Sequence, residues 1–448
     1  MNRERLISVI VPTHNSETYI VECMHSIMNQ TYRNLQIICV DSSKDRTVAI
    51  LEELREKDAR IQIIQDNNSS YGYKINTGIR LARGDYIGIV ESDDYIRLEM
   101  YKDMLENLQD EMVDYVKCAA DYFMDVNGQR FFEKNQSEII EKNVDRIIDL
   151  AKEPDFAWME IPKIWSALYR RSFLSENDIW LNETPGASYQ DTSFSMLVAV
   201  YAKTCVYKEG AYYCYRNDNI NSSVKSSSKV LCVCDEYEYL KTTLMKKQKY
   251  VGDVYRRILK EKLYTYSWNI KRLNVESCEV FRKHIQNELE ECREVLKSCF
   301  HSNDLSCLDI LSNQRALEQY WKENEAMIEQ WSNFINLVKA GNKFVLIGAG
   351  NIGTKVVFLQ KIYNDNFIFA IGDNYGSGLS DELRNCIVES VQSVVDKYPQ
   401  SKYVIANKKS YKKIRKQLED LGVSETQILE LSKNIGKIQL LELYKKYL

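Results

Sequence analysis

The stretch Tyr86-Ile87-Gly88-Ile89-Val90-Glu91-Ser92-Asp93-Asp94-Tyr95 decides the fold, because a mostly apolar run passes directly into three carboxylates. A short apolar run of this kind predicts a buried strand of a parallel sheet. Three acids at the exit of one strand repel each other unless a cation neutralises them. Ligands also bind at the carboxyl ends of strands in open α/β sheets. The stretch alone fits two interpretations equally well: a divalent metal that faces a phosphate-bearing ligand, or a strand followed by an acidic turn.

The composition is that of an ordinary globular protein. The chain has 448 residues, of which 44% are hydrophobic and 28% are charged, and its formal net charge is −4. The length predicts about three domains, and the charge gives no support for nucleic-acid binding. The first residues contain no apolar signal core, and no run of about 18 apolar residues occurs in the chain. We therefore expect a cytoplasmic protein.

The cysteines and histidines do not form a metal or disulfide pattern. The chain has twelve cysteines and four histidines. No Cys-x-x-Cys occurs, and the side chains of the closest pair, Cys232 and Cys234, point apart on a strand or on a helix. The histidines are too scattered to form a local metal motif. We expect reduced and mostly buried thiols.

The opening stretch closes a regular alternation of strands and helices. The periodicity predicts strands at 6–12, 35–40, 60–65 and 86–90, with helices at 17–29, 46–57 and 74–83 between them. This order predicts a parallel sheet with right-handed crossovers. Parallel strands bring the polar residues that follow them to one edge of the sheet, namely Thr13, Asn15, Asp41, Asn68, Lys74, Glu91, Asp93 and Asp94.

These polar residues suit a nucleoside diphosphate and a metal ion. Asp41 is a good acceptor for the ring N–H of a planar base, and Lys74 lies near a helix N-terminus, where it would face a diphosphate. The acids after the fourth strand are the oxygen ligands that Mg²⁺ and Mn²⁺ prefer. A sheet edge that is merely polar remains the alternative, and the ordered collection of these groups disfavours it.

Four motifs in this order resemble the family-2 glycosyltransferases of GT-A fold, over about residues 6 to 225. They are ISVIVPTHN at 7–15, VDSS at 40–43, NTGIRLARGDYI at 76–87 and ESDD at 91–94. The resemblance implies an inverting transfer from a nucleoside-diphosphate sugar, usually a UDP-sugar, with Mn²⁺ or Mg²⁺ as cofactor. It implies that the metal ligand is Asp93 and that the donor contacts include Pro12, Thr13, Asn15, Asp41, Glu91 and Ser92.

Three positions depart from the pattern of the resembled family. Glu91 stands where the first Asp of the Asp-x-Asp motif is usual, which puts its ribose contact in question. The segment YGYKIN at 71–76 looks like a subgroup with Tyr-Gly-x-Lys-x-Asn, which gives the cationic role at the donor to Lys74. The resemblance implies that Asp191 is the catalytic base, although an Asp in the first turn of a helix is also favourable for structural reasons. Gln190 replaces the usual Glu beside this base.

The rest of the first 230 residues is less informative. The segments YYCYR at 212–216 and NSSV at 221–224 resemble the part of the family that lies over the donor site. Arg216 is expected either at the diphosphate or in a surface ion pair. We predict a strand at 113–118 and a helix at 143–152. Three tryptophans could stack on a sugar acceptor, but for each of them a place in the core is the better expectation: Trp158, Trp165 and Trp180.

The C-terminal half contains a helical segment and a second nucleotide-binding pattern. Residues 230–340 have a helical pattern with charged faces and no proline. A strand at 343–347 then leads into a Gly-x-Gly-x-x-Gly turn, formed by Gly348, Gly350 and Gly353, with Asp373 about 20 residues further on. Only about 110 residues remain for this fold. We therefore expect an accessory or structural role for it rather than dehydrogenase chemistry.

Lysine-rich runs occur near the end of the chain, at 408–413 and 444–447. They could touch an anionic membrane surface, where a lipid-linked acceptor would be found. Solvated helix faces are the more ordinary interpretation.

The sequence thus predicts an α/β protein in three parts. These are a GT-A domain with a mainly parallel sheet (1–230), a helical segment (231–340) and a smaller Rossmann-like domain (341–448). The expected function is a cytoplasmic glycosyltransferase of surface polysaccharide synthesis. Its expected partners are a nucleotide-sugar donor, a glycan or lipid-linked acceptor, the inner face of the membrane and a second copy of the chain. The alternatives are an NAD-dependent oxidoreductase or epimerase in the C-terminal domain, and a catalytically dead sugar-nucleotide-binding scaffold.

Overall fold

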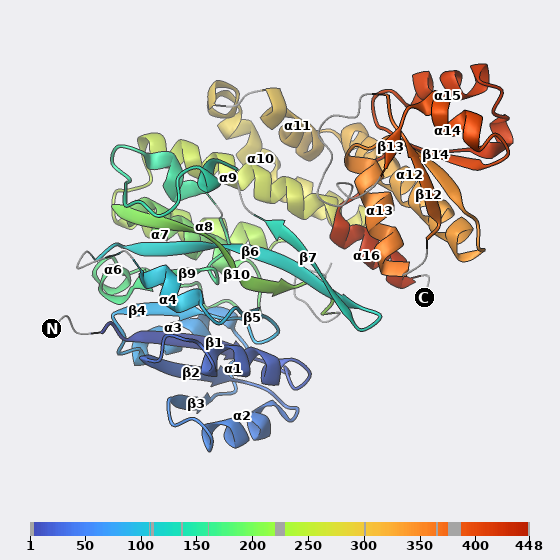
Figure 1. Cartoon of the computed structure of the whole chain (residues 1–448). Helices are drawn as coiled ribbons and strands as arrows, with labels where there is room; N and C mark the ends of the chain where they lie inside the picture. The colour runs from blue at the N-terminus through green and yellow to red at the C-terminus, as the bar shows by residue number, and fades with distance from the viewer. Residues whose placement is uncertain are drawn as a thin grey trace. The chain divides into compact units, whose positions relative to one another are not determined.

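The computed structural model describes residues 4–106, 108, 112–135, 138–159, 161–219, 229–299, 302–363, 366–374 and 387–446. The chain has two sheets, each with its own helices, and the predicted α/β class is confirmed (Figure 1). Its contacts divide it into two compact units. Unit 1 comprises Met1–Phe123 and Lys134–Gln314, and unit 2 comprises Met124–Glu133 and Arg315–Leu448. The division into three domains at 230 and 340 stays a prediction.

The parallel half of the first sheet follows the predicted alternation. Its strands run in the order β3-β2-β1-β4, and all three neighbouring pairs are parallel. The strands are β1 (Ile7–Thr13), β2 (Leu35–Asp41), β3 (Ile61–Gln65) and β4 (Tyr86–Ile89), and the helices between them are α1 (Ile20–Met28), α2 (Thr47–Arg55) and α3 (Tyr71–Leu81). Every residue of β1 and β2 is buried. Both faces of these strands are therefore covered, which explains their continuous apolar sequence.

The register of these strands sets the edge where the site lies. Thr13 pairs with Asp41, and Asp41 pairs with Gln65, so the three strands end side by side. Ile10 pairs with Ile89, so the stretch after β4 leaves the sheet at the same edge. The polar residues predicted to gather there come from loops that this register brings together.

The other half of the first sheet is mixed. The order continues with β9, β6, β10 and β5, while β7 pairs with β6 and β8 pairs with β10. Strand β9 is antiparallel to β4 and β6, β10 is parallel to β6, and β5 is antiparallel to β10. These strands are β5 (Tyr95–Ile96), β6 (Tyr115–Val126), β7 (Gln129–Asn135), β8 (Ile148–Asp149), β9 (Ala167–Arg170) and β10 (Thr204–Arg216).

The helix predicted at 143–152 is wrong. A short helix, α5 (Glu138–Glu141), ends before this range, and β8 occupies its middle. Asp145 has a φ of 58°, a left-handed conformation that interrupts a helix. Ile148 is buried opposite Cys205 of β10, so pairing with the sheet overrides the local helical pattern.

The helical segment expected after residue 230 is confirmed. It consists of α8 (Cys232–Lys246), α9 (Gly252–Lys271), α10 (Val275–Cys299), α11 (Ser302–Ser312) and α12 (Gln314–Lys339). The first four of these helices belong to unit 1, which also contains α4 (Met100–Leu105), α6 (Arg171–Glu176), α7 (Gln190–Tyr201) and a 3₁₀ turn at Pro154–Trp158. Helix α8 packs on α7, and α9 packs on α8 and α10. Unit 1 therefore has a helical layer well beyond residue 230.

Unit 2 carries a doubly wound parallel sheet, in the order β13-β12-β11-β14-β15. Alternate residues of β11 face two separate cores: Phe344 and Leu346 lie in one, and Val345 and Ile347 lie in the other. Helices α12, α13 (Asn351–Tyr363) and α16 (Lys437–Lys446) cover the first face, and α14 (Val391–Lys397) and α15 (Tyr411–Asp420) cover the second. The remaining strands are β11 (Phe344–Ile347), β12 (Ile368–Gly372), β13 (Val388–Glu389), β14 (Lys402–Ala406) and β15 (Ile428–Leu431).

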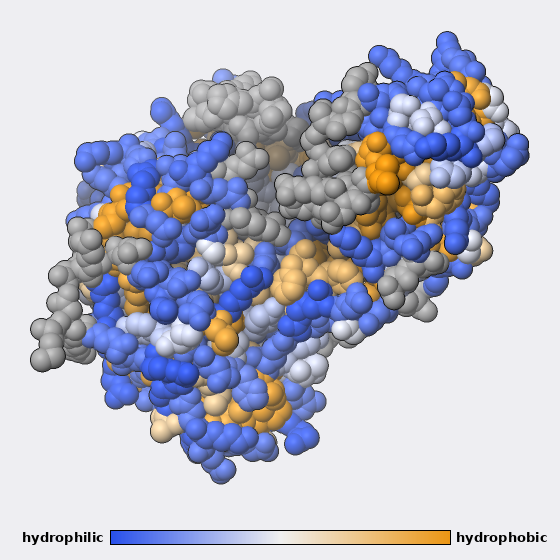
Figure 2. Space-filling view, in the orientation of Figure 1, coloured by the Kyte–Doolittle hydropathy of each residue, from blue (hydrophilic) through white to orange (hydrophobic). Residues whose placement is uncertain are grey.

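The face drawn in Figure 2 is mostly polar. Hydrophilic residues cover most of the drawn face, and hydrophobic residues form small separate groups on it (Figure 2). Within the described ranges, none of the helices combines the length and the apolar character needed to cross a bilayer. Eight of the ten cysteines whose side chains are described are buried, as predicted.

Candidate active site

The ends of β1 and β2 form one wall of the candidate site. Thr13 donates a hydrogen bond from Oγ1 to Oδ1 of Asp41 at 2.6 Å, and both side chains are buried. Asp41 also accepts hydrogen bonds from the backbone N (2.9 Å) and the hydroxyl (2.6 Å) of Ser43. Both carboxylate oxygens of Asp41 are therefore held by the protein itself. The carboxylate of Asp41, the predicted acceptor for the base, is therefore buried rather than free in solvent.

The loop after β1 is tied to the loop after β2. Pro12 is buried as the second-last residue of β1, whereas Asn15 is exposed and has a φ of 51°. Its side-chain oxygen accepts a hydrogen bond from the backbone N of Lys44 at 2.8 Å, and its own backbone N donates to the hydroxyl of Ser43 at 2.8 Å. An Asn tolerates this left-handed conformation better than most residues. The two loops thus form one fixed surface at the sheet edge.

Lys74 is a buried cation under this surface. Its Nζ donates a hydrogen bond to the backbone oxygen of Thr13 at 3.0 Å. Burial lowers the pKa of Lys74 to about 8, against the opposing effect of the negative charges of Asp41 and Glu91. The structure therefore brings Lys74 together with both predicted donor-binding acids.

Each residue of the Tyr-Gly-x-Lys-x-Asn segment has a structural role. Tyr71 donates its hydroxyl to Oε1 of Glu91 at 2.5 Å. A Cβ on Gly72 would lie 1.9 Å from the backbone oxygen of Asn182, so only glycine allows this approach. Asn76 donates to the oxygen of Leu181 at 2.9 Å and accepts from its nitrogen at 3.0 Å. Helix α3 thereby fastens the 181–182 segment, which leads to α7.

The three acids of the opening stretch have different environments. Asp94 is buried and accepts hydrogen bonds from the hydroxyl of Tyr213 and the backbone N of Arg216, both at 2.7 Å. Glu91 is half-buried and bonded to Tyr71, as described above. Asp93 is half-buried and accepts a hydrogen bond from Nδ2 of Asn219 at 2.8 Å. Asp94 thus has a structural role, while Glu91 and Asp93 line the edge.

Ser92 and Arg216 hold the acidic stretch in place. The hydroxyls of Ser92 and Ser16 are 2.6 Å apart. Arg216 is 6% exposed and donates from Nε to the backbone oxygen of Asp93 at 2.8 Å. Its guanidinium lies between two rings, 4.6 Å from the centre of Tyr19 and 4.5 Å from that of Phe123, and it also pairs with the acids Glu22 and Asp218. Arg216 therefore lies beneath the acidic stretch and not on the surface.

Asp191 approaches the same edge from α7. It lies in the first turn of the helix and accepts a hydrogen bond from the backbone N of Thr192 at 2.9 Å. Burial raises its pKa to about 6. Burial also raises the pKa of Glu91 to about 8, and the negative charges of Asp93 and Asp191 add to this increase. The pKa of Tyr71 is raised by burial and then by the charges of Glu91 and Asp191. Residues 71, 91 and 191 therefore share one site.

Gln190 builds the loop that presents Asp191. Its side chain is buried, and its amide oxygen accepts a hydrogen bond from the backbone N of Ser188 at 2.5 Å. Its amide nitrogen donates to Oγ1 of Thr184 at 2.9 Å and to the backbone oxygen of Gly186 at 3.0 Å. An amide can donate and accept in this way, whereas an ionised Glu can only accept. The Gln in place of the family's Glu thus closes the turn before α7 and leaves Asp191 as the one acid of the pair.

Glu236 is a buried acid that the sequence interpretation missed. It lies on α8, is 1% exposed, and accepts hydrogen bonds from Ser193 (2.5 Å), Asn182 (3.0 Å) and Thr184 (3.3 Å). Burial raises its pKa to about 7, with a smaller contribution from the charge of Asp191. One signal in the sequence could have found it, because Glu236 interrupts the apolar side of α8 formed by Val233, Tyr237, Leu240 and Leu244.

The donor set suits a metal ion that is shared with a phosphate ligand. Throughout the described ranges, no three His, Cys, Asp or Glu side chains gather into a complete metal site. Mg²⁺ is commonly held by one or two carboxylates and completes its shell with substrate phosphates and water. The half-buried carboxylate of Asp93 at the sheet edge fits this pattern. Residues 221–224, predicted to lie over the donor, are outside the described residues.

The glycine turn of unit 2 is shaped by close backbone contacts. Gly348 has a φ of 110°, and a Cβ on Gly353 would lie 2.0 Å from the oxygen of Gly348. Gly350 has open space around it. Asp373 accepts a hydrogen bond from the backbone N of Ala349 at 2.7 Å, so its carboxylate fastens the turn. Ligand binding by these residues stays a prediction.

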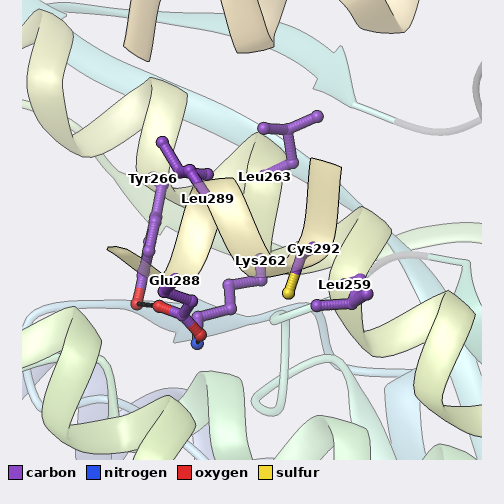
Figure 3. A pocket seen from close by; sticks show the side chains of 7 residues that line it. All are labelled: Leu259, Lys262, Leu263, Tyr266, Glu288, Leu289 and Cys292. Atoms are coloured by element: carbon purple, nitrogen blue, oxygen red, sulfur yellow. Dashed lines mark hydrogen bonds and ion pairs between the residues drawn. The ribbon is translucent and has the colours of Figure 1, made fainter. Parts of the chain in front are cut away.

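A small pocket lies elsewhere in unit 1, between α9 and α10. It is shallow and is lined mainly by apolar side chains (Figure 3). Lys262 and Glu288 point toward each other in it and form an ion pair, and the hydroxyl of Tyr266 donates to Glu288 at 3.4 Å. None of the predicted site residues lines this pocket. The pocket is a feature of helix packing rather than part of the candidate active site.

The fold and the site together define an α/β domain with acids and a buried lysine at the carboxyl edge of its sheet, where open α/β sheets bind their ligands. Residues 8–176 match the family model described as Glycosyl transferase family 2. Residues 8–176 of this chain therefore form a domain of the family-2 glycosyltransferases.

Two curated relatives agree with this assignment. The chain is 31% identical over 222 residues to the uncharacterized glycosyltransferase EpsJ of Bacillus subtilis (strain 168), covering 48% of this chain and 62% of EpsJ. It is 31% identical over 216 residues to the putative glycosyltransferase EpsH of the same organism, covering 47% of this chain and 60% of EpsH. The matches thus span less than two thirds of these relatives. A crystal structure of S. aureus TarS residues 1–349 with UDP-GlcNAc is similar with a TM-score of 0.49 and 19% identity, over 69% of this chain and 91% of that chain.

Proposed function

We propose that this chain transfers a sugar from a nucleoside-diphosphate donor, a UDP-sugar, to a hydroxyl of a glycan or lipid-linked glycan, with inversion at the anomeric carbon. The observation that carries the proposal is the meeting of Glu91, Asp93 and Asp191 at one sheet edge, from segments far apart in the sequence. Family membership of the N-terminal domain supports the same reaction.

Asp93 and the groups beneath it serve the leaving group in this proposal. Asp93 would hold the metal, Mn²⁺ or Mg²⁺, which neutralises charge on the departing diphosphate when it is bound. Arg216 fixes the backbone of Asp93 through its 2.8 Å hydrogen bond. Lys74 lies under the loop after β1 and keeps positive charge near the donor. Pro12, Thr13, Asn15 and Asp41 shape the nucleotide wall.

Asp191 serves the acceptor. With a pKa of about 6 it is ionised at neutral pH and is still a better base than an ordinary Asp. In an inverting displacement the base removes the proton of the acceptor hydroxyl as that oxygen attacks the anomeric carbon, opposite the leaving diphosphate. A well-placed base contributes about 10²–10⁴-fold to the rate. The role in surface polysaccharide synthesis, and a location in the cytoplasm at the inner face of the membrane, belong to the same proposal.

A ligand panel followed by a product assay tests this function. Thermal shifts are measured with UDP-, GDP- and dTDP-sugars and with NAD⁺, each with and without Mn²⁺. We expect one UDP-sugar to stabilise the chain in a metal-dependent way and to release UDP on incubation. Asp93→Asn should abolish that release. Stabilisation by NAD⁺, with turnover that survives Asp93→Asn, would instead favour an oxidoreductase or epimerase in unit 2. Binding without any turnover would favour a catalytically dead scaffold.

A further inference from the structure

Two aromatic side chains with a cation at each end follow one side of α9 and its C-cap residue. Lys260, Tyr264, Trp268 and Arg272 follow one another at intervals of four residues, the spacing of neighbours on a helix. Tyr264 and Trp268 are 37% and 46% exposed. The Nζ of Lys260 lies 6.0 Å from the centre of the Tyr264 ring, and the guanidinium of Arg272 lies 5.4 Å from that of the Trp268 ring. We call these four residues the α9 stripe.

The C-terminal end of the α9 stripe touches the loop that presents Asp191. The ring of Trp268 lies edge-on to that of Tyr189, with 6.0 Å between their centres. Arg272 donates from Nε to the hydroxyl of Tyr189 at 3.0 Å, and that hydroxyl donates to Oδ1 of Asn269 at 2.8 Å. Tyr189 has a φ of 65° and stands two residues before Asp191. The stripe is therefore attached to the proposed base by a fixed link.

The chemistry of the α9 stripe suits a sugar chain. Exposed aromatic side chains that cluster on a surface mark a binding site more often than a chance arrangement. A sugar ring has an apolar C–H face that stacks on a flat aromatic ring, and its hydroxyls stay at the wet edge, where Tyr and Trp offer polar groups. Lys260 and Arg272 add positive charge at the two ends of the aromatic pair, which favours a chain that carries negative groups.

A membrane surface fits the α9 stripe less well. Helices that lie in a membrane interface present a broad apolar face. On α9 the two exposed aromatics form a narrow row, and the polar residues Glu261 and Thr265 come directly beside it in the sequence, both half-buried. A narrow row of flat rings matches an extended chain better than it matches a lipid surface.

We propose that the α9 stripe is the acceptor subsite, which binds an anionic glycan chain and leads its end toward Asp191. This proposal rests on the proposed function and adds the class of acceptor and the surface that selects it. The family match ends at residue 176, so it does not include α9.

Affinity electrophoresis of the full chain tests the subsite without needing a donor. Migration is compared in native gels that contain hyaluronan, an anionic polymer of alternating uronic acid and N-acetylhexosamine, or dextran, a neutral glucan. The variants are Tyr264→Ala/Trp268→Ala and, as a control, Phe369→Ala, which removes a similarly exposed aromatic (43%) from unit 2. We expect hyaluronan to retard the wild type and the control more than dextran does. The double variant should bind hyaluronan at least about tenfold more weakly, a loss of about 1.4 kcal/mol.

Hydrolysis of the donor by water shows whether the double variant damages the active site as well as the acceptor subsite. The double variant should release UDP at a rate within about twofold of the wild type, because both rings lie outside the donor wall. An equal loss of UDP release and glycan binding would make the rings part of the active-site fold and would overturn the subsite. A wild type that releases no UDP contradicts the proposed function alone, while retardation that is lost in the double variant still supports glycan binding.

Two further outcomes overturn the acceptor subsite. The first is equal retardation of the wild type and the double variant, or no retardation of the wild type in either polymer. The second is sedimentation with phosphatidylglycerol vesicles, lost in the double variant, in a protein that hyaluronan does not retard. That result would assign the α9 stripe to a membrane surface.

Discussion

Arg216 supports Asp93 from below, through a 2.8 Å hydrogen bond from its Nε to the backbone oxygen of Asp93. The same guanidinium is enclosed by the rings of Tyr19 and Phe123 and paired with Glu22 and Asp218. A lysine has the charge but not the planar fork that makes these contacts together. The position of the proposed metal ligand therefore depends on an arginine 123 residues later in the sequence.

Arg216→Lys is expected to weaken metal binding more than nucleotide binding. Loss of a group that orients a metal ligand typically costs about 10–100-fold in metal affinity. We expect the Mn²⁺ concentration for half-maximal UDP release to rise about tenfold, and the affinity for UDP without metal to stay within about twofold. Arg216→Ala would also leave its acidic partners without the buried cation and should lower the free energy of unfolding by about 3 kcal/mol.

Arg170→Lys is the matched control for Arg216→Lys. Arg170 forms an ion pair with Asp114 at 2.5 Å, but it pairs with Tyr86 at the opposite end of β4 from Glu91. This variant should lose some stability without any change in the Mn²⁺ requirement. Equal Mn²⁺ requirements in the two variants would contradict the role given to Arg216.

Asp191→Asn is expected to remove transfer while donor binding remains. The amide keeps the size and the helix position but cannot take a proton, so the rate of transfer should fall about 10²–10⁴-fold. The dissociation constant for UDP, measured by calorimetry, should change less than threefold. Asp253→Asn is the control, because Asp253 also lies in the first turn of a helix, on the exposed surface of α9. Wild-type transfer by Asp191→Asn would remove Asp191 from the mechanism.

The pH dependence of transfer should report the ionisation of Asp191. Its pKa is raised to about 6 by burial, and the reaction needs the deprotonated form. The value of kcat/KM should therefore fall about tenfold per pH unit well below pH 6. The residual activity of Asp191→Asn should lack this acidic decrease. A wild-type profile that stays flat down to pH 4.5 would show that the base has the pKa of an ordinary carboxyl or is another group.

The sequence predicted those parts of the site that depend on local order. The regular alternation of strands and helices predicted the parallel sheet. Parallel strands place Thr13, Asp41 and Glu91 at one edge whatever the details of packing. The glycine pattern likewise predicted the turn at Gly348, and the expected helix at Asp191 is present. Such features follow from residues close together in the chain, so periodicity and spacing reveal them.

The parts that the sequence did not predict depend on contacts between distant segments. The sequence left Arg216 either at the diphosphate or in a surface ion pair, yet the rings of Tyr19 and Phe123 enclose its guanidinium. The helix expected at 143–152 gave way to β8, because Ile148 pairs with β10. Glu236 lies among polar groups from the 182–193 region that no spacing rule connects to α8. Packing decides these positions, and a single sequence contains no direct record of it.

The stability contribution of Glu236 should depend on pH in a defined direction. Its pKa is raised from the ordinary value of 4.5 to about 7, so between these values the folded chain holds a proton that the unfolded chain has lost. Stability therefore falls as pH rises through this interval. Glu236→Gln removes this titration, so the stability of the wild type relative to this variant should fall by up to about 3 kcal/mol between pH 4.5 and 7.5.

Urea unfolding of both proteins at each pH measures this difference, because the other titrating groups cancel in the comparison. Glu238→Gln is the control, since Glu238 is exposed on the same helix. A Glu236→Gln difference that does not vary with pH would mean that Glu236 titrates as an exposed acid, against its 1% exposure and three hydrogen bonds.

Gly72→Ala tests the attachment of α3 to the segment before α7, because helix propensity and packing predict opposite signs. Inside a helix, alanine is favoured over glycine by up to about 1 kcal/mol. At this position, however, the added Cβ would lie 1.9 Å from the oxygen and 2.8 Å from the carbon of the Asn182 carbonyl, which are backbone atoms. Overpacking of this kind costs about 1–3 kcal/mol, so we expect a net loss of stability.

The same shift should strain the Asn76–Leu181 hydrogen bonds, 2.9 and 3.0 Å long, and reduce transfer. Gly436→Ala is the control, because its new Cβ meets only the flexible end of Gln439, at 3.5 Å. Its free energy of unfolding should lie within about 0.5 kcal/mol of the wild-type value. A Gly72→Ala chain that is more stable than the wild type and fully active would show that α3 does not hold this segment.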